Sequence, residues 1–177
     1  VAVDQIKKSA EYAEIVIAEV NDQMPRTHGD SFLHVSEITY FVEYSHPVLE
    51  IPRPKITDVE RAIGENVASL INDGDCLQLG IGGIPDAVLQ FLKDKRGLGV
   101  HTEMFSDGVV ELVEGGAIDN KNKTLHKGKI ISTFLMGSRK LYDFVDDNPM
   151  VWMLPCDYVN DPSVIARNDN MISVNSS

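Results

Sequence analysis

The run Cys76-Leu-Gln-Leu-Gly-Ile-Gly-Gly-Ile-Pro85 decides the fold that this sequence predicts. Its first four residues are typical of a short strand, and the glycines after them allow the backbone to turn tightly. Pro85 suits the first turn of a helix, where its missing N–H group costs nothing. The apolar residues from Ile84 to Leu92 then recur at helical spacing. The run therefore predicts a strand that passes through a glycine loop into a helix.

Strands and helices continue to alternate on both sides of this run. Upstream, Thr57 and Glu60 have the spacing of a capping box, and Gly74 is a suitable end for the helix that they begin. The apolar stripe predicted for that helix consists of Ile56, Val59, Ala62, Ile63, Val67, Leu70 and Ile71. Downstream, the pattern predicts strands at 98–102, 129–135, 150–154 and 171–174, and helices at 107–113 and 138–145. This order predicts an α/β fold with a largely parallel sheet and flanking helices.

The first 46 residues give weaker signals. The pattern predicts a helix up to Tyr12 and a short buried strand at 14–19, and it leaves the type of 35–44 open. Three prolines within eight residues then favour an extended linker. We therefore expect the end of a first α/β half at 1–46, a Pro-rich linker at 47–55, and the front part of a second half at 56–177. Since the sequence starts at Val1 and stops soon after a predicted strand, we expect an interior piece of a longer protein, incomplete at both ends.

Composition narrows the classes of function. The 177 residues carry a net charge of -11, which disfavours a general electrostatic attraction to nucleic acid or to an anionic membrane. No apolar run approaches the roughly 18 residues of a membrane span. Two cysteines cannot form a disulfide framework and have no second cysteine nearby for a metal pair. We therefore expect a cytoplasmic protein that binds no metal and no nucleic acid and does not associate with a membrane.

Two features could form a binding or catalytic site. The glycine loop precedes a helix N-terminus, which suits an anionic oxygen, although glycines also serve plain turns. Glu103 directly follows the strand at 98–102, at the carboxyl end where α/β sheets place their sites. Together they nearly match a dinucleotide fingerprint, with Glu103 at the position of the ribose-binding acid. Pro85 stands where that fingerprint needs its third glycine, so a nucleotide-binding module without chemistry is the weaker reading.

Several motifs resemble the acetyl-CoA hydrolase/transferase family, the family I CoA-transferases. They are Gln78-Leu-Gly-Ile-Gly-Gly-Ile-Pro-Asp-Ala-Val88, His101-Thr-Glu-Met-Phe-Ser-Asp-Gly108, Phe134-Leu-Met-Gly137 and Leu141-Tyr142-Asp143, with further matches at 17–23, 34–37 and 157–164. The resemblance runs from end to end and is closest to the 4-hydroxybutyrate CoA-transferases. It implies the NagB/RpiA/CoA-transferase-like fold and transfer of CoA between a short acyl-CoA and a small carboxylate, with acyl-CoA hydrolysis as the alternative.

The resemblance also implies roles for particular residues. Glu103 matches the catalytic glutamate of the family, and Gly80, Ile81, Gly82, Gly83 and Ile84 match its CoA-contacting loop. CoA is then a substrate, no cofactor is held permanently, and a homo-oligomer is the one protein partner that it suggests. A glutamate carboxylate is normally ionised at neutral pH and can attack a thioester without a separate base.

Other polar residues have plainer interpretations. We expect His101 to point away from Glu103 and to serve packing. The basic run Lys121, Lys123, His126, Lys127 and Lys129 could touch CoA phosphates, but a solvated loop fits it better. Asp157, Asn160 and Asp161 are explained by turn chemistry.

Overall fold

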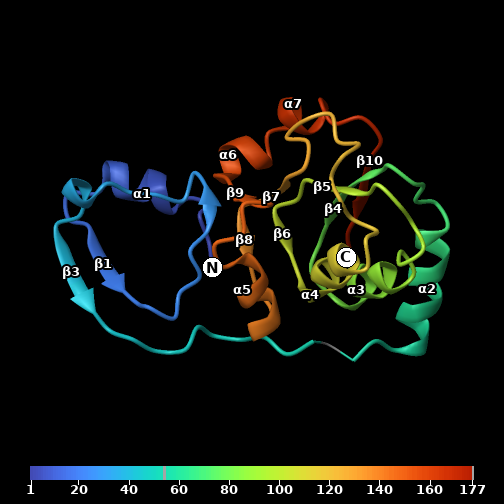
Figure 1. Cartoon of the computed structure of the whole chain (residues 1–177), viewed down its shortest axis with the longest axis horizontal. Helices are drawn as coiled ribbons and strands as arrows, with labels where there is room; N and C mark the ends of the chain where they lie inside the picture. Colours follow the sequence, from blue (N-terminus) through green and yellow to red (C-terminus); the bar gives the residue numbers. More distant parts are fainter. Residues whose placement is uncertain (54, 177) are drawn as a thin grey trace.

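The structure is a computed structural model that describes residues 1–53 and 55–176 (Figure 1). Its strands are β1 (Ile17–Val20), β2 (His28–Gly29), β3 (Tyr40–Glu43), β4 (Cys76–Leu79), β5 (Gly99–Val100), β6 (Met104–Phe105), β7 (Ile130–Ser132), β8 (Phe134–Leu135), β9 (Val151–Met153) and β10 (Met171–Val174). Its helices are α1 (Ile6–Tyr12), the 3-10 helix η1 (Val35–Glu37), α2 (Asp58–Ala68), α3 (Gly83–Gln90), α4 (Asp107–Glu114), α5 (Arg139–Val145), α6 (Cys156–Val159) and α7 (Pro162–Ile165).

Parallel strands form the centre of the larger part of the molecule. β4 lies between β10 and β5, and β9 lies between β2 and β7. A parallel bridge between His101 and Ile131 joins these two groups, and the neighbouring strands β6 and β8 continue the same pairing. Every pair of named strands is parallel, so the predicted α/β fold with a largely parallel sheet is confirmed.

The strand–glycine–helix run folds as predicted. Its strand is β4, and α3 begins at Gly83 directly after the loop. Val88 and Leu92 are fully buried in the core, and Ala87 is fully buried against Gly64 of α2, in agreement with the predicted apolar face of this helix. The core around them is formed by aliphatic side chains of the strands and of α3, α4 and α5.

Helix α2 begins at the predicted capping box but buries only part of the predicted face. The Thr57 side chain accepts from the Glu60 N–H, and the Glu60 carboxylate accepts from the Thr57 N–H. However, Val59 is 69% exposed and Leu70 72% exposed, although both belong to the predicted stripe. The residues that α2 buries are Gly64 and Ala68. The predicted stripe is confirmed at Ile71, which is fully buried, and at Val67, which packs against the core. It is wrong at the exposed residues because α2 packs closely against α3 through Gly64, where only small side chains fit.

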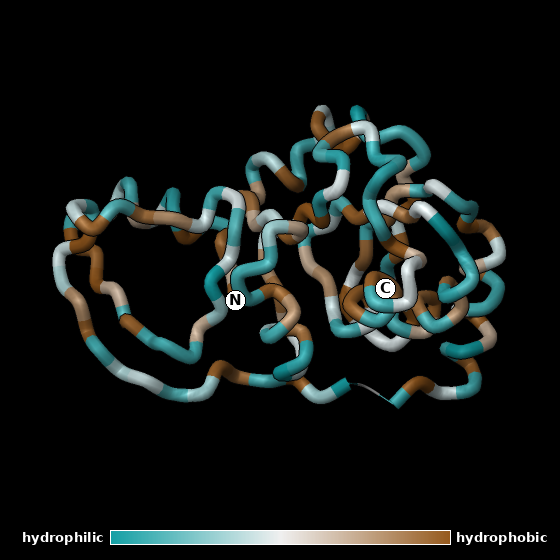
Figure 2. Tube along the Cα trace, in the orientation of Figure 1, coloured by the Kyte–Doolittle hydropathy of each residue, from teal (hydrophilic) through white to brown (hydrophobic). Residues whose placement is uncertain are grey.

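Within the first 46 residues, a lobe that contains α1, β1, η1 and β3 extends away from the body (Figure 1), whereas Val3 is buried in the core and β2 pairs with β9. β1 and β3 pair in parallel, but the predicted burial of the strand at 14–19 is wrong: Ile17 is 64% exposed. The tube in Figure 2 is brown along parts of this ribbon, which shows that hydrophobic residues occur there as well as in the core. The segment 35–44, left open by the sequence, contains η1 and β3.

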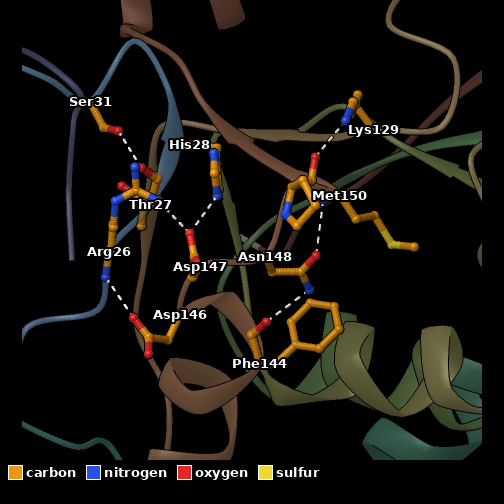
Figure 3. Close-up of polar contacts among 11 residues, drawn as sticks. Arg26, Thr27, His28, Ser31, Lys129, Phe144, Asp146, Asp147, Asn148 and Met150 are labelled. Atoms are coloured by element: carbon orange, nitrogen blue, oxygen red, sulfur yellow. Dashed lines mark hydrogen bonds and ion pairs between the residues drawn. The ribbon is translucent and has the colours of Figure 1, made fainter.

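A group of polar contacts attaches this lobe to the end of α5 (Figure 3). The Asp147 carboxylate binds the Arg26 guanidinium and lies 3.1 Å from His28 Nε2, while the Asp147 N–H donates to the Arg26 carbonyl over 2.8 Å. The Arg26 N–H donates to Asp146 Oδ1 over 2.8 Å. Asp147 has a φ of +48°, and both its side chain and its N–H contact Arg26. We call these four residues, Arg26, His28, Asp146 and Asp147, the latch.

The predicted linker runs along the body as an extended segment. The Ile51 N–H donates to the Gly137 carbonyl over 2.9 Å, and Tyr142 Oη donates to the Leu49 carbonyl over 2.8 Å. The Arg139 N–H donates to the Glu50 carboxylate over 2.8 Å. Pro54 of the predicted linker and Ser177 of the predicted second half lie outside the described residues. The division into two halves and a linker stays a prediction.

Candidate functional site

The glycine loop has a backbone that only glycine adopts readily. Gly82 has φ +127° and ψ 179°, a region closed to side chains with a Cβ atom. Gly82 is also the N-cap of α3, so no side chain of the cap satisfies the first N–H groups of that helix. A Cβ atom on Gly80 would lie 2.6 Å from Asn175 Oδ1, and Ser176 Oγ donates to the Ile81 carbonyl over 3.0 Å. The chain after β10 therefore packs along one side of the loop.

A carboxylate of the chain itself lies at the start of α3. A Cβ atom on Gly83 would collide with the Glu60 carboxylate, so a side chain at position 83 would require that carboxylate to move. Hydrogen bonds from the Thr57 N–H over 2.7 Å and Thr57 Oγ1 over 2.8 Å hold this carboxylate and lower the pKa of Glu60. A negative charge at a helix N-terminus is favourable. An anionic ligand at the loop would share this end of α3 with Glu60.

Glu103 presents an exposed carboxylate on a buried stretch of backbone. The residues on both sides of it, Thr102 and Met104, are buried, whereas the Glu103 side chain reaches solvent. Asn160 Nδ2 donates to Glu103 Oε2 over 2.7 Å from the end of α6. The sequence suggested only turn chemistry for Asn160, because the two residues are 57 positions apart and no local pattern connects them.

His101 lies on the same side of the strand as Glu103, and the prediction that it points away was wrong. Both side chains contact consecutive residues at the end of α6. His101 Nε2 lies 2.9 Å from the Val159 carbonyl, next to the Asn160 that binds Glu103. His101 is buried, and burial lowers its pKa. Its role in packing, with a hydrogen bond to α6, agrees with the sequence interpretation.

The carboxyl ends of β4 and β5 bring Glu103 and the glycine loop close together in the backbone. Thr102 Oγ1 accepts from the Leu79 N–H over 2.9 Å and lies 3.0 Å from the Leu79 carbonyl. Leu79 directly precedes Gly80, and Thr102 directly precedes Glu103. The two predicted site features are thus joined through one buried hydroxyl.

The main cavity lies beside the glycine loop but does not include Glu103. It has a volume of about 340 Å³ and is lined by residues of the predicted linker, of α3 and of α4. Gly80, Ile81 and Gly82 line it, and so does Met104, the residue after Glu103. The Glu103 carboxylate instead contacts Asn160 at the end of α6, whereas Met104 lines the cavity. Of the predicted site, the loop borders the cavity, and the carboxylate does not.

The cavity is mainly apolar and contains one carboxyl group with a shifted pKa. Leu89, Leu112 and Met136 contribute apolar surface. Burial raises the pKa of Asp86, which accepts a hydrogen bond from Ser106 Oγ over 2.7 Å. Such a lining suits an apolar chain with a hydrogen-bonding group near Asp86.

Lys123 corrects the interpretation of the basic run. Lys121 and Lys127 are exposed, as predicted for a solvated loop, but Lys123 is buried with 2% of its surface exposed. Lys123 Nζ donates to the Val100 and Lys129 carbonyls, both over 2.7 Å. Burial lowers its pKa to about 8. Lys123 therefore fixes the loop against β5 and is not available to a phosphate.

The buried thiol and the metal-ligating side chains offer no further site. Burial raises the pKa of the Cys76 thiol to about 11, which makes it a poor nucleophile. Over residues 1–53 and 55–176, no group of three or more His, Cys, Asp or Glu side chains is arranged to hold a metal ion. In the same described residues, no helix is long and apolar enough to cross a membrane.

Comparisons with protein families match both ends of the chain. Residues 1–52 match the acetyl-CoA hydrolase/transferase N-terminal domain, and residues 137–177 match the acetyl-CoA hydrolase/transferase C-terminal domain. The intervening residues contain the glycine loop and Glu103.

Individual relatives are similar over nearly the whole chain. A 4-hydroxybutyrate coenzyme A transferase of Clostridium kluyveri is 66% identical over 98% of the chain, which is 40% of that protein. A succinyl-CoA:cyclohexane-1-carboxylate CoA transferase of Geobacter metallireducens is 46% identical over 93% of the chain and 38% of its own length. The crystal structure of a 4-hydroxybutyrate CoA-transferase from Porphyromonas gingivalis superimposes with a TM-score of 0.95 at 49% identity, covering 99% of this chain and 45% of that one. The chain thus spans about 40% of the length of the curated relatives it matches.

Proposed function

The chain belongs to the acetyl-CoA hydrolase/transferase family, and from this we propose that the full-length protein containing it is a CoA-transferase. The proposed reaction moves CoA from a short acyl-CoA, such as 4-hydroxybutyryl-CoA or acetyl-CoA, to a small carboxylic acid. The names of the relatives support this choice of substrates. CoA enters as a substrate and leaves as part of a product, so the reaction needs no resident cofactor.

Glu103 is the proposed nucleophile, and one observation supports this most directly. Its carboxylate is exposed, while its backbone and both neighbouring residues are buried and hydrogen-bonded at the carboxyl end of a parallel strand. A nucleophile must reach its substrate and must also be held in place. Asn160 holds the carboxylate through Oε2, which leaves Oε1 for attack.

The first half of the proposed reaction transfers CoA to the protein. One carboxylate oxygen of Glu103 attacks the acyl carbon, the C–S bond breaks, and CoA leaves as a thiolate. The product is a mixed anhydride of Glu103 and the acyl group. The thiolate then attacks the glutamyl carbon, the bond to the acyl carboxylate breaks, and a glutamyl-CoA thioester remains. Splitting one difficult exchange into easier covalent steps is the usual advantage of such an intermediate.

The second half runs the same steps with the acceptor acid. Its carboxylate attacks the glutamyl thioester, CoA thiolate leaves, and the thiolate then attacks the acyl carbon of the new anhydride. Glu103 is released as a carboxylate, and the two substrates thus react one after the other in ping-pong order. Each attack creates an oxyanion, for which the uncapped N–H groups at the start of α3 are the proposed donors.

The test is chemical trapping of Glu103 in the full-length protein. The protein is incubated with acetyl-CoA, reduced with borohydride, and digested for mass spectrometry. We expect a modification at Glu103 in the wild type and none in Glu103→Gln. The same substitution is expected to lower kcat by about 10³-fold or more, because it removes the nucleophile.

An exposed glutamate outside the site provides the matched control. Glu65→Gln in α2 is expected to keep both the modification at Glu103 and the turnover. Absence of a trapped Glu103 in an active wild type would contradict the proposal. Trapping that is relieved by water as fast as by an added carboxylate would identify a hydrolase instead.

A further inference from the structure

The backbone of Glu103 is held by more hydrogen bonds than pairing of strands requires. The Glu103 carbonyl accepts from the Thr133 N–H over 2.8 Å and from the Phe134 N–H over 3.1 Å. Thr133 Oγ1 donates to the same carbonyl over 3.1 Å, and Ser132 Oγ lies 2.9 Å from it. Four donors from the β7–β8 junction thus converge on one oxygen, although Ser132 shares its proton with the Phe134 carbonyl at 3.0 Å.

A third hydroxyl, from Thr102, holds the carbonyl of the residue that follows Glu103. Thr102 Oγ1 lies 2.9 Å from the Met104 carbonyl and also contacts the N–H and carbonyl of Leu79 at the end of β4. Glu103 is therefore flanked by a hydroxyl from its own strand and by two from the neighbouring strand. We call Thr102, Ser132 and Thr133 the hydroxyl clamp.

The clamp is buried although the residue it holds is exposed. Ser132 and Thr133 have 0% of their surface exposed and Thr102 has 1%. Burying a hydroxyl without a partner is unfavourable, so these three side chains are stable inside only because their partners are in place. An apolar residue of similar shape would fill the same space without the hydrogen bonds. Filling of space alone therefore does not account for two hydroxyls on the Glu103 carbonyl and a third on the Met104 carbonyl.

We infer that the hydroxyl clamp positions Glu103, by fixing its backbone relative to the first residue of the glycine loop. This inference rests on the proposed function of Glu103. Thr102 is the central member, since its one hydroxyl contacts both Leu79, beside Gly80, and Met104, beside Glu103. The clamp sets the distance between the nucleophile and the loop that is proposed to bind the acyl-CoA. Its members are positioning residues and do not contact the reacting atoms.

The test compares variants with and without the hydroxyl in the full-length protein. Thr102→Val keeps the branched shape and removes the hydroxyl, whereas Thr102→Ser keeps the hydroxyl. We expect Thr102→Val to lower kcat and the rate of Glu103 acylation by about 10–100-fold with little change in KM, since small displacements at a reacting group have effects of this size. Thr102→Ser is expected to recover most of the rate. Thr133→Val and Thr133→Ser should show the same difference.

Thr124→Val is the matched control, because Thr124 also makes two side-chain hydrogen bonds, to Asp169, at a distance in the sequence from Glu103. It should leave kcat unchanged. Equal loss in the Val and Ser variants, or a Thr102→Val protein that folds and acylates Glu103 at the wild-type rate, would overturn the inference and leave the proposed function standing. A wild type that turns over without acylating Glu103 would overturn both.

Discussion

At the scale of single residues, the partners of a side chain decide what it does. Glu103 and Lys123 show this in opposite directions. Glu103 was predicted from its place after a strand, and the structure leaves it exposed with Asn160 as its partner. Lys123 has the same local surroundings as its exposed neighbours in the basic run, yet it is buried under two carbonyl groups. Local sequence could not distinguish it, because the carbonyl of Val100 comes from a strand more than twenty residues away.

Lys123 gives a prediction about the pH dependence of stability. Its pKa falls from the ordinary value of 10.5 to about 8 in the folded chain. Between these values the unfolded chain binds more protons than the folded chain, so the free energy of unfolding should rise with pH from about 8 to 10. In Lys123→Met this contribution is absent. Urea unfolding at several pH values, followed by the fluorescence of Trp152, measures the difference.

Lys127→Met serves as the control for Lys123→Met, because Lys127 is exposed in the same loop. Its stability should follow the wild type across this pH range. Stability curves of the wild type and Lys123→Met that stay parallel from pH 7 to 10 would show that the burial of Lys123 is not maintained in solution.

At the scale of elements, caps were predictable and packing faces were not. The capping box of Thr57 and Glu60 lies within three residues, and its geometry is confirmed. The buried face of α2 depends instead on α3, which approaches so closely that Gly64 meets Ala87. The predicted stripe of large apolar residues is buried only at its end, around Val67 and Ile71, because hydrophobicity alone does not show how near the neighbouring helix lies.

Gly64 gives the prediction at this scale. A Cβ atom at position 64 would lie 2.8 Å from the Ala87 Cβ atom. In an exposed helix interior, replacing glycine by alanine is stabilising by about 1 kcal/mol. Here we expect Gly64→Ala to destabilise the chain by about 1–3 kcal/mol, because α2 and α3 must move apart. Urea unfolding measures the change.

Arg61→Ala, on the exposed side of the same helix, controls for the change in helix propensity. It should alter the free energy of unfolding by less than about 0.5 kcal/mol. A Gly64→Ala variant as stable as the wild type would mean that the two helices are separated more widely than in the structure.

At the scale of the whole molecule, the latch and the predicted linker help to attach the first lobe, beside the pairing of β2 with β9 and the burial of Val3. The latch connects residues about 120 positions apart in the sequence. Hydrogen bonds from Arg26 and His28 lower the pKa of Asp147, so its contribution to stability is present above the ordinary carboxyl pKa and is lost as the pH falls below it. These groups are exposed, so salt should weaken their interaction.

Asp147→Asn tests the latch. Asparagine tolerates the positive φ of this position but removes the charge that binds Arg26. We expect faster amide hydrogen exchange at residues 26–31 in the variant and no change in the core strands. Asp143→Asn, which breaks an ion pair with Arg139 within α5, should leave exchange at 26–31 unaffected. Equal exchange at 26–31 in Asp147→Asn and the wild type would show that the ionic contacts do not hold the lobe.

The sequence by itself determined the α/β class, the strand–glycine–helix run and the start of α2. These depend on patterns within a few residues: alternation, helical spacing, caps and glycine conformations. Its family motifs also located Glu103 and the glycine loop as the candidate site. Only the tertiary structure decided that Asn160 holds Glu103 and that Lys123 is buried. It also decided that the cavity borders the loop and not the carboxylate, and that three buried hydroxyls hold the carbonyls of Glu103 and Met104. The physical reason is that burial and hydrogen bonding depend on which distant segments come into contact, and a local sequence pattern carries no information about those contacts.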